Sequence, residues 1–323
     1  MAAVVSLFCG CTPKSHTSHF FAMDTVMTVT AYGDGAKDAC QAAEKLIFHL
    51  ASLADAYDEK SDIGKINSNS GKYVTVSNST VEQIEKAKEI CEKSLGDYDI
   101  TVHSVYDAWG FTKENAKVPE DEIIHQLLEK VGGERVHIGE NNTVMVDSGT
   151  QISLASIAKG YASQKAAQLL SEKGISSAVI DLGGNIYVLG KKADGEKWRI
   201  GVQDPFENGG VAVTLSVCDT AVVTSGSYQR NFTENGVMYH HIIDPKIGYP
   251  VDNELISVTV VCEDGAYADG LSTALFVMGL DCGTEFYKEN GGFEAVFITK
   301  DEKMYVTKGI DASSAKYDLT YIE

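Results

Sequence analysis

The chain has 323 residues, of which 44% are hydrophobic and 23% charged, a balance typical of a globular protein with a substantial core. Its formal net charge of −19 argues against nucleic acid as a partner and against electrostatic attachment to anionic lipid. The same charge means that a polyphosphate ligand needs local neutralisation, which a divalent cation can supply. The seven cysteines include no Cys-x-x-Cys pair, and their spacing predicts neither a zinc site nor a disulfide framework.

The N-terminal segment is apolar up to Cys11 and ends in Leu-Phe-Cys-Gly-Cys. Gly10 before an acylatable Cys11 is typical of a bacterial lipoprotein signal, although the apolar run is short and no basic residue precedes it. A buried N-terminal strand is the alternative. We therefore expect residues 1–19 to form a lipoprotein-type signal and tether, and residues 20–323 to form the folded domain. No other segment is apolar enough to span a bilayer.

The first third of the chain alternates between strand and helix patterns. Phe20–Thr30 alternates apolar and polar residues toward its end and is predicted to be a strand. Lys37–Tyr57 carries an apolar stripe at three-and-four spacing, which predicts an amphipathic helix, and Val81–Leu95 predicts a second helix. Tyr57 lies at the end of the first stripe, where it either belongs to the core or contacts a ligand.

The stretch Ile152–Gly190 is the predicted centre of the protein. Its middle, Ile157–Lys173, has the periodicity of a helix, and Ser153 and Ser156 precede it as candidate capping residues. Free N–H groups at such a helix start can bind an anion. Two predicted strands, Ser177–Leu182 and Asn185–Leu189, flank Gly183-Gly184, where backbone can approach a ligand closely. The alternative is an ordinary helix packed on a sheet beside a glycine turn.

Two histidines stand in the segment that is richest in chemistry. A hydroxyl-rich run, Thr224–Tyr228, lies upstream of His240 and His241, which precede an Asp-Pro turn at Asp244. A lone histidine on a strand is usually structural. The hydroxyls and the turn around this pair make His241 a candidate proton acceptor, with His240 in an accessory role.

Asp269, Ser272 and Thr273 stand at positions i, i+3 and i+4 of a helix predicted to open at Ala268, so their side chains share one face. A carboxylate with hydroxyl and carbonyl oxygens is a set of hard ligands suited to Mg²⁺. The alternative is an N-cap aspartate followed by hydroxyl residues in the first turns, which is a common pattern.

These segments together resemble the ApbE family of flavin transferases, also called FAD:protein FMN transferases, over nearly all of the chain after Phe20. The matching segments are Tyr98–Val102, Trp109–Phe111, Ser153–Ala162, Gly183-Gly184, Trp198–Pro205, Thr224–Tyr228 and His241–Val251. Two positions depart from the family pattern. Asp24 replaces the glycine of an opening Met-Gly-Thr strand, and Ile247 replaces the threonine before Gly248.

The resemblance implies an α+β fold, in which a single large domain has two lobes around a flavin cleft, and FAD as the substrate. His241 and Asp269 are implied as catalytic residues, with His241 taking a proton. Mg²⁺ is implied at Ser156, Asp269, Ser272 and Thr273. Contacts with FAD are implied for Met23, Tyr57, Asp97, Tyr98, Asp99, Ser153, Lys159 and Ile243. Tyr98 is expected to stack on the ring and Asp99 to accept a hydrogen bond from it; a solvated acidic loop is the alternative.

The implied reaction is attack by a threonine or serine hydroxyl of an acceptor protein on the FMN-side phosphorus of FAD, with release of AMP. The implied acceptor is a flavoprotein subunit of a redox complex at the extracytoplasmic face of a bacterial membrane, where a lipid on Cys11 would anchor this chain. Two alternatives remain. One is a hydrolase of the same fold that splits FAD with water, and the other is a non-catalytic flavin-binding lipoprotein that needs neither the metal ligands nor His241.

Overall fold

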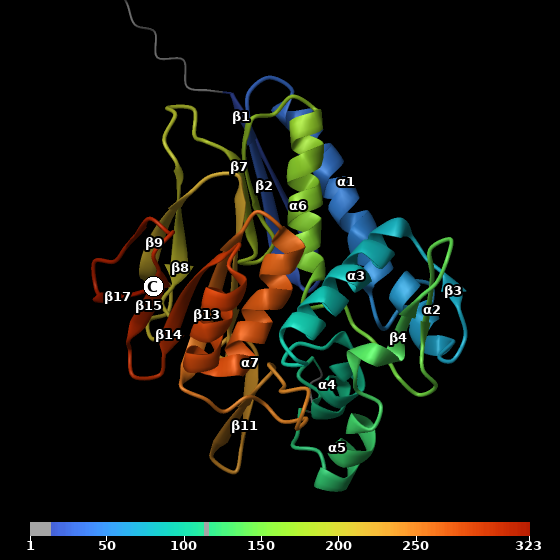
Figure 1. The fold of residues 1–323 in the computed structure, drawn as a ribbon. Coiled ribbons are helices and arrows are strands. Elements are labelled where there is room, and N and C mark those ends of the chain that lie inside the picture. Colours follow the sequence, from blue (N-terminus) through green and yellow to red (C-terminus); the bar gives the residue numbers. More distant parts are fainter. Residues whose placement is uncertain (1–13, 113–115) are drawn as a thin grey trace, which may run out of the picture.

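A nine-stranded sheet runs through the molecule in the order β1-β2-β6-β7-β10-β13-β14-β15-β17 (Figure 1). The computed structural model describes residues 14–112 and 116–323. All neighbouring strands are antiparallel except β15 and β17, which pair in parallel. The strands are β1 (Ser15–Ala22), β2 (Thr25–Tyr32), β6 (Ser177–Asp181), β7 (Ile186–Gly190), β10 (Thr220–Gly226), β13 (Leu255–Cys262), β14 (Glu294–Thr299), β15 (Met304–Thr307) and β17 (Leu319–Ile322).

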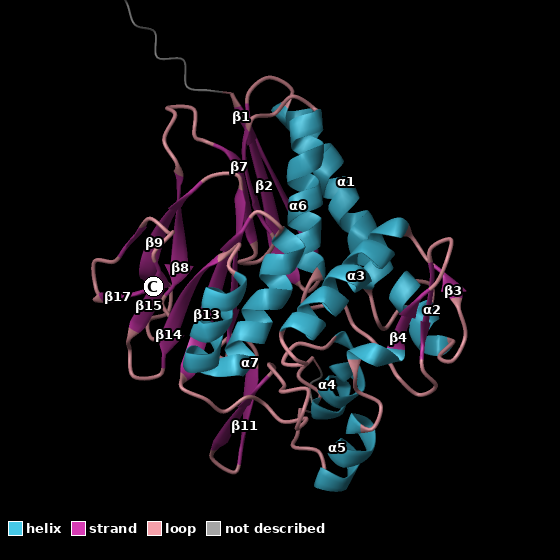
Figure 2. Cartoon of the chain, viewed as in Figure 1, coloured by secondary structure: helices cyan, strands magenta, loops and turns pink. Residues whose placement is uncertain are grey.

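Three long helices cover one face of this sheet (Figure 2): α1 (Ala36–Ala54), α6 (Ala158–Glu172) and α7 (Gly265–Asn290). The buried residues of α1 recur every three or four positions, so one stripe of the helix faces the sheet. Alternate residues of β2, namely Met27, Val29 and Ala31, are fully buried in the same core. Helix α7 bends at Gly279, where φ is 79°.

The opposite face of the sheet has a second core under a three-stranded sheet ordered β16-β9-β8. Its strands are β8 (Trp198–Gln203), β9 (Val211–Val217) and β16 (Ala312–Ser313). Val222 of β10 belongs to this second core, whereas its neighbours Ala221 and Val223 belong to the helix-covered core. Because both faces of the large sheet are covered, its central strands are apolar on both sides.

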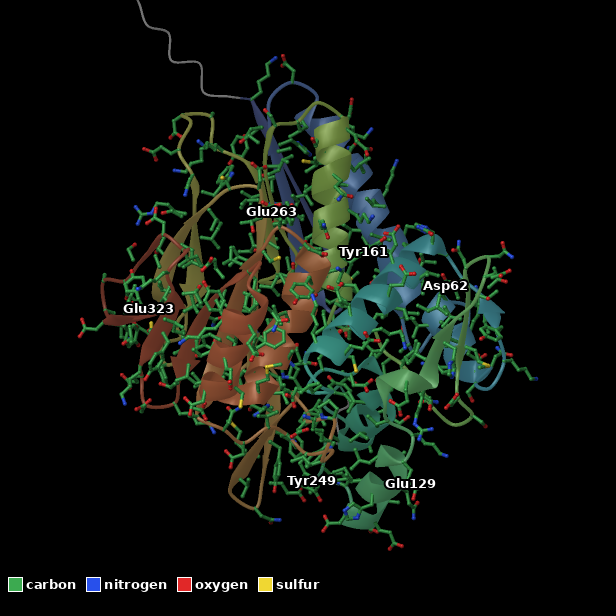
Figure 3. The ribbon with its side chains drawn as sticks, viewed as in Figure 1. Asp62, Glu129, Tyr161, Tyr249, Glu263 and Glu323 are labelled. Carbon is green, nitrogen blue, oxygen red and sulfur yellow. The ribbon has the colours of Figure 1, made fainter. Side chains whose placement is uncertain are left out.

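The remaining short elements form a group beside the helices, at the right and bottom of Figure 1. They are α2 (Asp62–Ser68), α3 (Asn78–Lys93), α4 (His103–Trp109), α5 (Asp121–Leu128), the 3₁₀ turns η1 (Ile100–Val102) and η2 (Gly133–Arg135), β3 (Val74–Thr75), β4 (Val136–Ile138), β5 (Thr143–Val146), and the hairpin β11 (Asn231–Glu234) and β12 (Val237–His240). Trp109 organises a small aromatic core there with Phe111, Phe232 and Tyr239. Tyr249, labelled in Figure 3, packs on the same ring and donates a hydrogen bond to Asp121 of α5.

The α+β class and the main helices predicted from the sequence are confirmed, with three corrections. Phe20–Thr30 is not one strand, because the chain reverses at Met23-Asp24 between β1 and β2. Helix α1 ends at Ala54, since Asp55 is extended and its side chain accepts a hydrogen bond from the N–H of Tyr57. Strand β1 begins at Ser15, so five residues that were assigned to the tether belong to β1.

Two expectations stay open at this level. The division into two lobes remains a prediction, and Cys11 lies outside the described residues. In the part of the chain that the structure describes, every helix is too short or too polar to cross a bilayer.

Candidate functional site

Helices α6 and α7 approach each other backbone to backbone. A Cβ atom on Gly160 would lie 2.0 Å from the carbonyl oxygen of Gly265, and one on Gly265 would lie 2.5 Å from the carbonyl oxygen of Gly160. Only glycine fits at both positions, because any side chain would push the helices apart. The crossing brings Asp269 of α7 against the first turn of α6.

Asp269 is buried and closes the N-terminal end of α6 from the neighbouring helix. Its Oδ2 atom accepts a hydrogen bond of 2.8 Å from the N–H of Gly160, which places a carboxylate at the positive end of α6. Burial raises the pKa of Asp269 to about 6, while the charge of Lys159, the Gly160 N–H and the Asn185 amide act to lower it. The carboxylate therefore ionises only with the support of these groups.

The capping prediction for α6 is wrong. The residue at its N-cap position is Ile157, and no side chain of its own segment caps the helix. Ser153 instead accepts a hydrogen bond from the N–H of Ala155 within the preceding turn, at 3.2 Å. The side-chain acceptor for an N–H group at the start of α6, which local spacing assigned to a serine, is Asp269, a residue more than 100 positions away in the sequence.

A cluster of hydroxyl groups lies next to Asp269. Ser225, near the end of β10, has its Oγ 2.8 Å from Oγ of Ser272 and 3.2 Å from Oγ1 of Thr273. Ser272 also donates a hydrogen bond of 2.8 Å to the carbonyl oxygen of Asp269. The shared face of Ser272 and Thr273 is thus confirmed. The predicted start of this helix at Ala268 is wrong, however. Helix α7 begins at Gly265, so Asp269 lies in its second turn.

Ser156 and Tyr98 form the next wall of the site. The hydroxyl of Ser156 donates to the Tyr98 hydroxyl at 3.1 Å. Burial and the nearby charge of Asp269 raise the pKa of Tyr98, so Ser156 and Asp269 flank the same phenol group. The ring of Tyr98 is 2% exposed and packs against Gly270. It therefore offers no free face for the stacking that the sequence led us to expect.

His241 follows β12, and the charge of Lys159 acts on it as it does on Asp269. Its backbone N–H donates to the carbonyl oxygen of Arg230 at 3.0 Å, and Nδ1 lies 3.3 Å from that oxygen. An N–H at Nδ1 leaves Nε2 as the acceptor. Burial, helped by the neighbouring His240, Arg230 and Lys159, lowers the pKa of His241 to about 4, while the hydrogen bond to the Arg230 carbonyl oxygen acts to raise it. The imidazole is therefore neutral at ordinary pH and can accept a proton.

His240 has structural contacts on the other side of the same strand. Its Nε2 lies 2.8 Å from the carbonyl oxygen of Val251, and its Nδ1 accepts a hydrogen bond from the N–H of Ile242. The ring is edge-on to Phe276 of α7, with the ring centroids 5.7 Å apart. His240 thus fixes the end of β12, directly before His241, relative to helix α7.

A cavity of about 650 Å³ opens beside Asp99, between α3 and the loop that contains Gly132. Asp99 is buried, and its Oδ1 accepts hydrogen bonds from the N–H and the hydroxyl of Thr101 at 2.8 and 2.6 Å. Asp97 pairs with Lys246 at 2.7 Å, which joins this wall to the segment after His241. Burial raises the pKa of Asp99. The alternative of a solvated acidic loop is wrong for Asp99.

The β1–β2 turn explains the departure from the family pattern at Asp24. Met23 and Asp24 have φ values of 45° and 58°, in the left-handed region. Glycine adopts this conformation freely and aspartate is among the few other residues that tolerate it, so the turn survives the exchange. The Asp24 carboxylate lies 4.0 Å from the guanidinium of Arg230, whose carbonyl oxygen holds His241.

Tyr57 and Ile243 have opposite surroundings. Tyr57 is 59% exposed, and its hydroxyl donates to Asp107 at 3.2 Å. The alternative in which Tyr57 is a core residue is therefore wrong. Ile243 is buried in the aromatic core around Trp109, where it supports the loop after His241.

The oxygen atoms around Asp269 suit Mg²⁺ as part of a shared coordination sphere. Within residues 14–112 and 116–323, no group of three or more His, Cys, Asp or Glu side chains could hold a metal ion. Mg²⁺ commonly binds through one or two carboxylates and completes its octahedral shell with water and substrate phosphates. One carboxylate with the hydroxyls of Ser156, Ser272 and Thr273 therefore fits Mg²⁺ together with a pyrophosphate.

Two residues of the site were not assigned a role from the sequence. Ser225 belongs to a recognised motif, but only the structure places its hydroxyl on Ser272 and Thr273. Asn185 is buried beside Asp269, although its segment was predicted only as a strand. The available signal was a polar residue directly after Gly183-Gly184 at the start of an apolar strand.

The fold and the site define an α+β protein with a buried carboxylate, hydroxyl groups and a neutral histidine around the crossing of two helices. The ApbE family model matches residues 23–297, so the chain belongs to the ApbE family. The FAD:protein FMN transferase of Treponema pallidum is 32% identical over 307 residues, covering 88% of this chain and 85% of the relative. The enzyme of that name from Klebsiella pneumoniae is 30% identical over 267 residues, covering 81% and 83%.

Solved structures agree with this assignment. The ApbE protein of Thermotoga maritima superposes with a TM-score of 0.84 at 31% identity, covering 92% of this chain and 98% of that one. The flavin transferase ApbE of Vibrio cholerae gives a TM-score of 0.80 at 26% identity, covering 91% and 98%. The family and the fold predicted from the sequence are therefore confirmed.

Proposed function

We propose that this chain transfers the FMN moiety of FAD to a threonine or serine hydroxyl of an acceptor protein and releases AMP. One observation carries the proposal: the Asp269 carboxylate is fixed at the start of α6 by the Gly160 N–H, beside the hydroxyl cluster of Ser225, Ser272 and Thr273. Lys159, next to Gly160, acts electrostatically on both Asp269 and His241. The name FAD:protein FMN transferase, which relatives from two bacteria bear, agrees with this chemistry.

In the proposed reaction, the acceptor hydroxyl oxygen forms a bond to the FMN-side phosphorus of FAD. The bond from that phosphorus to the bridging oxygen breaks, and the bridging oxygen leaves with AMP. The hydroxyl proton passes to Nε2 of His241, which is free to accept it because the ring is neutral above about pH 4. Lys159 faces the charge that develops on the phosphoryl oxygens.

We propose that Mg²⁺ is bound by Asp269, Ser272 and Thr273 with an oxygen of Ser156. Mg²⁺ in this place would neutralise the pyrophosphate and polarise the phosphorus–oxygen bonds. The chain itself fixes the carboxylate through the N–H of Gly160, so Asp269 presents the same oxygen to each substrate. With a net charge of −19, the protein has little else to attract a polyphosphate.

The proposed contacts with FAD follow the walls of the site. Met23 in the β1–β2 turn and the exposed Tyr57 would contact the flavin. The cavity lined by Asp99 and Lys246, the partner of Asp97, has room for one ring system of FAD, with Tyr98 contributing backbone atoms because its ring is buried. Ser153 and Lys159 would line the path of the pyrophosphate between these ends, and Ile243 would contribute backbone atoms there because its side chain is buried in the aromatic core.

The decisive experiment incubates the purified chain with FAD, Mg²⁺ and a candidate acceptor domain, and measures intact masses together with free AMP and FMN. We expect the acceptor to gain the mass of one FMN moiety and AMP to appear in equal amount. Equal release of free AMP and FMN with and without acceptor would instead identify an FAD hydrolase. FAD binding without any product would identify a non-catalytic flavin-binding protein.

We propose further that Cys11 carries a lipid that anchors the chain at the extracytoplasmic face of a bacterial membrane, where its acceptor, a flavoprotein subunit of a redox complex, resides. The support is the sequence Leu-Phe-Cys-Gly-Cys alone. A chain with its native N-terminus, expressed in bacteria, should fractionate with membranes, and Cys11→Ser should move to the soluble fraction. Membrane association that survives Cys11→Ser would refute acylation at this residue.

A further inference from the structure

The turn between β6 and β7 delivers Asn185 to the protein interior. Gly183 and Gly184 have φ values of 72° and 90°, and a Cβ atom on Gly183 would lie 2.3 Å from Oγ1 of Thr25. The N–H of Leu182 donates to the carbonyl oxygen of Asn185 at 2.9 Å, which closes the turn. Asn185 then enters the space next to α6 and α7 and is 3% exposed.

Only one end of the Asn185 amide is satisfied. Ser163 of α6 donates a hydrogen bond of 3.1 Å to Oδ1, but Nδ2 is buried without a hydrogen bond of normal length among the described residues, although the amide lies close enough to the Asp269 carboxyl to act on its pKa. The reverse orientation of the amide would place its carbonyl oxygen beside the carboxylate of Asp269, where two acceptors repel each other. A buried unpaired N–H donor is destabilising, so its presence calls for a function.

The surroundings identify the group that this donor serves. The Asn185 side chain acts on the Asp269 carboxyl and lowers its pKa, against the larger effect of burial. Asp269 already accepts the N–H of Gly160 on Oδ2, and the single hydroxyl proton of Ser163 is shared between Asn185 Oδ1 and the carbonyl oxygen of Gly160, at 3.1 and 3.0 Å. One turn of α6 thus positions both groups around the same carboxylate.

We propose that Asn185 is a positioning residue whose Nδ2 donates to the ionised Asp269 carboxylate when a divalent cation is bound, so that the carboxylate is held by Asn185 and by the Gly160 backbone. The inference rests on the proposed function, in which Asp269 binds the cation. A hydrogen bond of this kind fixes the orientation of a metal-binding carboxylate, and removal of its donor typically lowers metal affinity. Asn185 itself touches neither the cation nor FAD.

The test replaces Asn185 with leucine, which has a similar size and no polar atoms. Mn²⁺ is titrated into the FAD-loaded protein without acceptor and followed by electron paramagnetic resonance. We expect Asn185→Leu to weaken Mn²⁺ binding by about 10–100-fold. In EDTA, the urea midpoint should stay close to that of the wild type, because the lost donor was unpaired and Ser163 keeps the Gly160 carbonyl as its acceptor.

Asn253→Leu is the matched control, because both ends of the Asn253 amide are paired in the metal-free fold. Its Nδ2 donates to the carbonyl oxygen of Phe276 at 2.8 Å, and its Oδ1 accepts the N–H of Leu255 at 2.9 Å. This variant should unfold at a lower urea concentration in EDTA and bind Mn²⁺ like the wild type. The two asparagines therefore separate a positioning role from a structural one.

Three results would overturn the inference. Asn185→Leu could bind Mn²⁺ as tightly as the wild type, or it could lose stability in EDTA like Asn253→Leu with unchanged Mn²⁺ affinity. It could also weaken FAD binding in EDTA, which would mean that Asn185 contacts the ligand directly. If the leucine variant does not fold, Asn185→Ala takes its place in the same assays. A wild type that binds no Mn²⁺ refutes the metal site as well, whereas FMN transfer to the acceptor tests the proposed function independently.

Discussion

Gly160→Ala tests whether the close crossing of α6 and α7 creates the site. The added Cβ would lie 2.0 Å from the carbonyl oxygen of Gly265 and 2.7 Å from Cβ of Asp269. Carbon and oxygen atoms normally approach to about 3.3 Å, so the helices must separate by about 1.3 Å. Overpacking typically costs about 1–3 kcal/mol, and more where backbone opposes backbone, while alanine regains about 1 kcal/mol of helix propensity.

The net loss is therefore about 2 kcal/mol, which lowers the midpoint of thermal unfolding by about 3 °C in a domain of this size, because the unfolding entropy is about 2.1 cal/mol/K per residue. The same separation breaks the 2.8 Å hydrogen bond between Gly160 and Asp269, so FMN transfer should fall at least about tenfold. Gly265→Ala, whose Cβ would meet the carbonyl oxygen of Gly160 at 2.5 Å, should reproduce both effects. Calorimetry and transfer rates measured well below the midpoint check the expectation.

Gly174→Ala is the matched control. Gly174 ends the same helix with φ at 82°, and its Cβ would enter open space, so alanine there costs about 1–2 kcal/mol through backbone strain alone. This variant should unfold earlier than the wild type and retain full transfer activity. If Gly160→Ala loses stability but transfers FMN like Gly174→Ala, the helix crossing is a packing feature and does not determine the site.

Three further predictions address the chemistry. Asp269→Asn keeps an acceptor for the Gly160 N–H but loses the charge, so turnover should nearly vanish and recover partly at high Mg²⁺, whereas full activity of the wild type in EDTA would refute the metal site. His241→Ala should slow transfer by about 10²–10⁴-fold and leave FAD affinity unchanged in an equilibrium titration; an equal loss of affinity would reduce His241 to a wall of the pocket. Because the pKa of Asp269 is raised to about 6 and that of His241 lowered to about 4, the transfer rate should fall as the pH drops below about 6, where Asp269 binds a proton while His241 is still neutral. Raising Mg²⁺ should move this decline to lower pH, and a decline near pH 4 that ignores Mg²⁺ would assign it to His241.

Local patterns were sufficient for the parts of the fold in which one segment determines its own structure. The stripe along α1 and the shared face of Ser272 and Thr273 both depend on helical periodicity, and both predictions are confirmed. The tight turn at Met23-Asp24 escaped notice, since aspartate in the left-handed region has no signal comparable to Asn-Gly or Gly-Gly.

Contacts between distant segments could not be predicted from the sequence. The cap of α6 comes from Asp269, and spacing around Ser153 and Ser156 contains no information about a carboxylate on another helix. Tyr98 was expected to stack on a ring, but the absence of a side chain at Gly270 lets its own ring pack there instead. The resemblance to the ApbE family gave the right family because its motifs record such distant contacts indirectly.

The charges around the site also indicate where a pyrophosphate can bind in a strongly acidic protein. Three cations lie near the proposed path, and two of them already have partners: Lys246 pairs with Asp97 at 2.7 Å, and Arg230 lies 4.0 Å from Asp24. Lys159 acts on Asp269 and His241 through space, and no carboxylate of residues 14–112 or 116–323 forms an ion pair with it. We therefore expect a phosphate group of the substrate to bind beside Lys159, with its phosphorus between the acidic, hydroxyl-lined wall and the histidine.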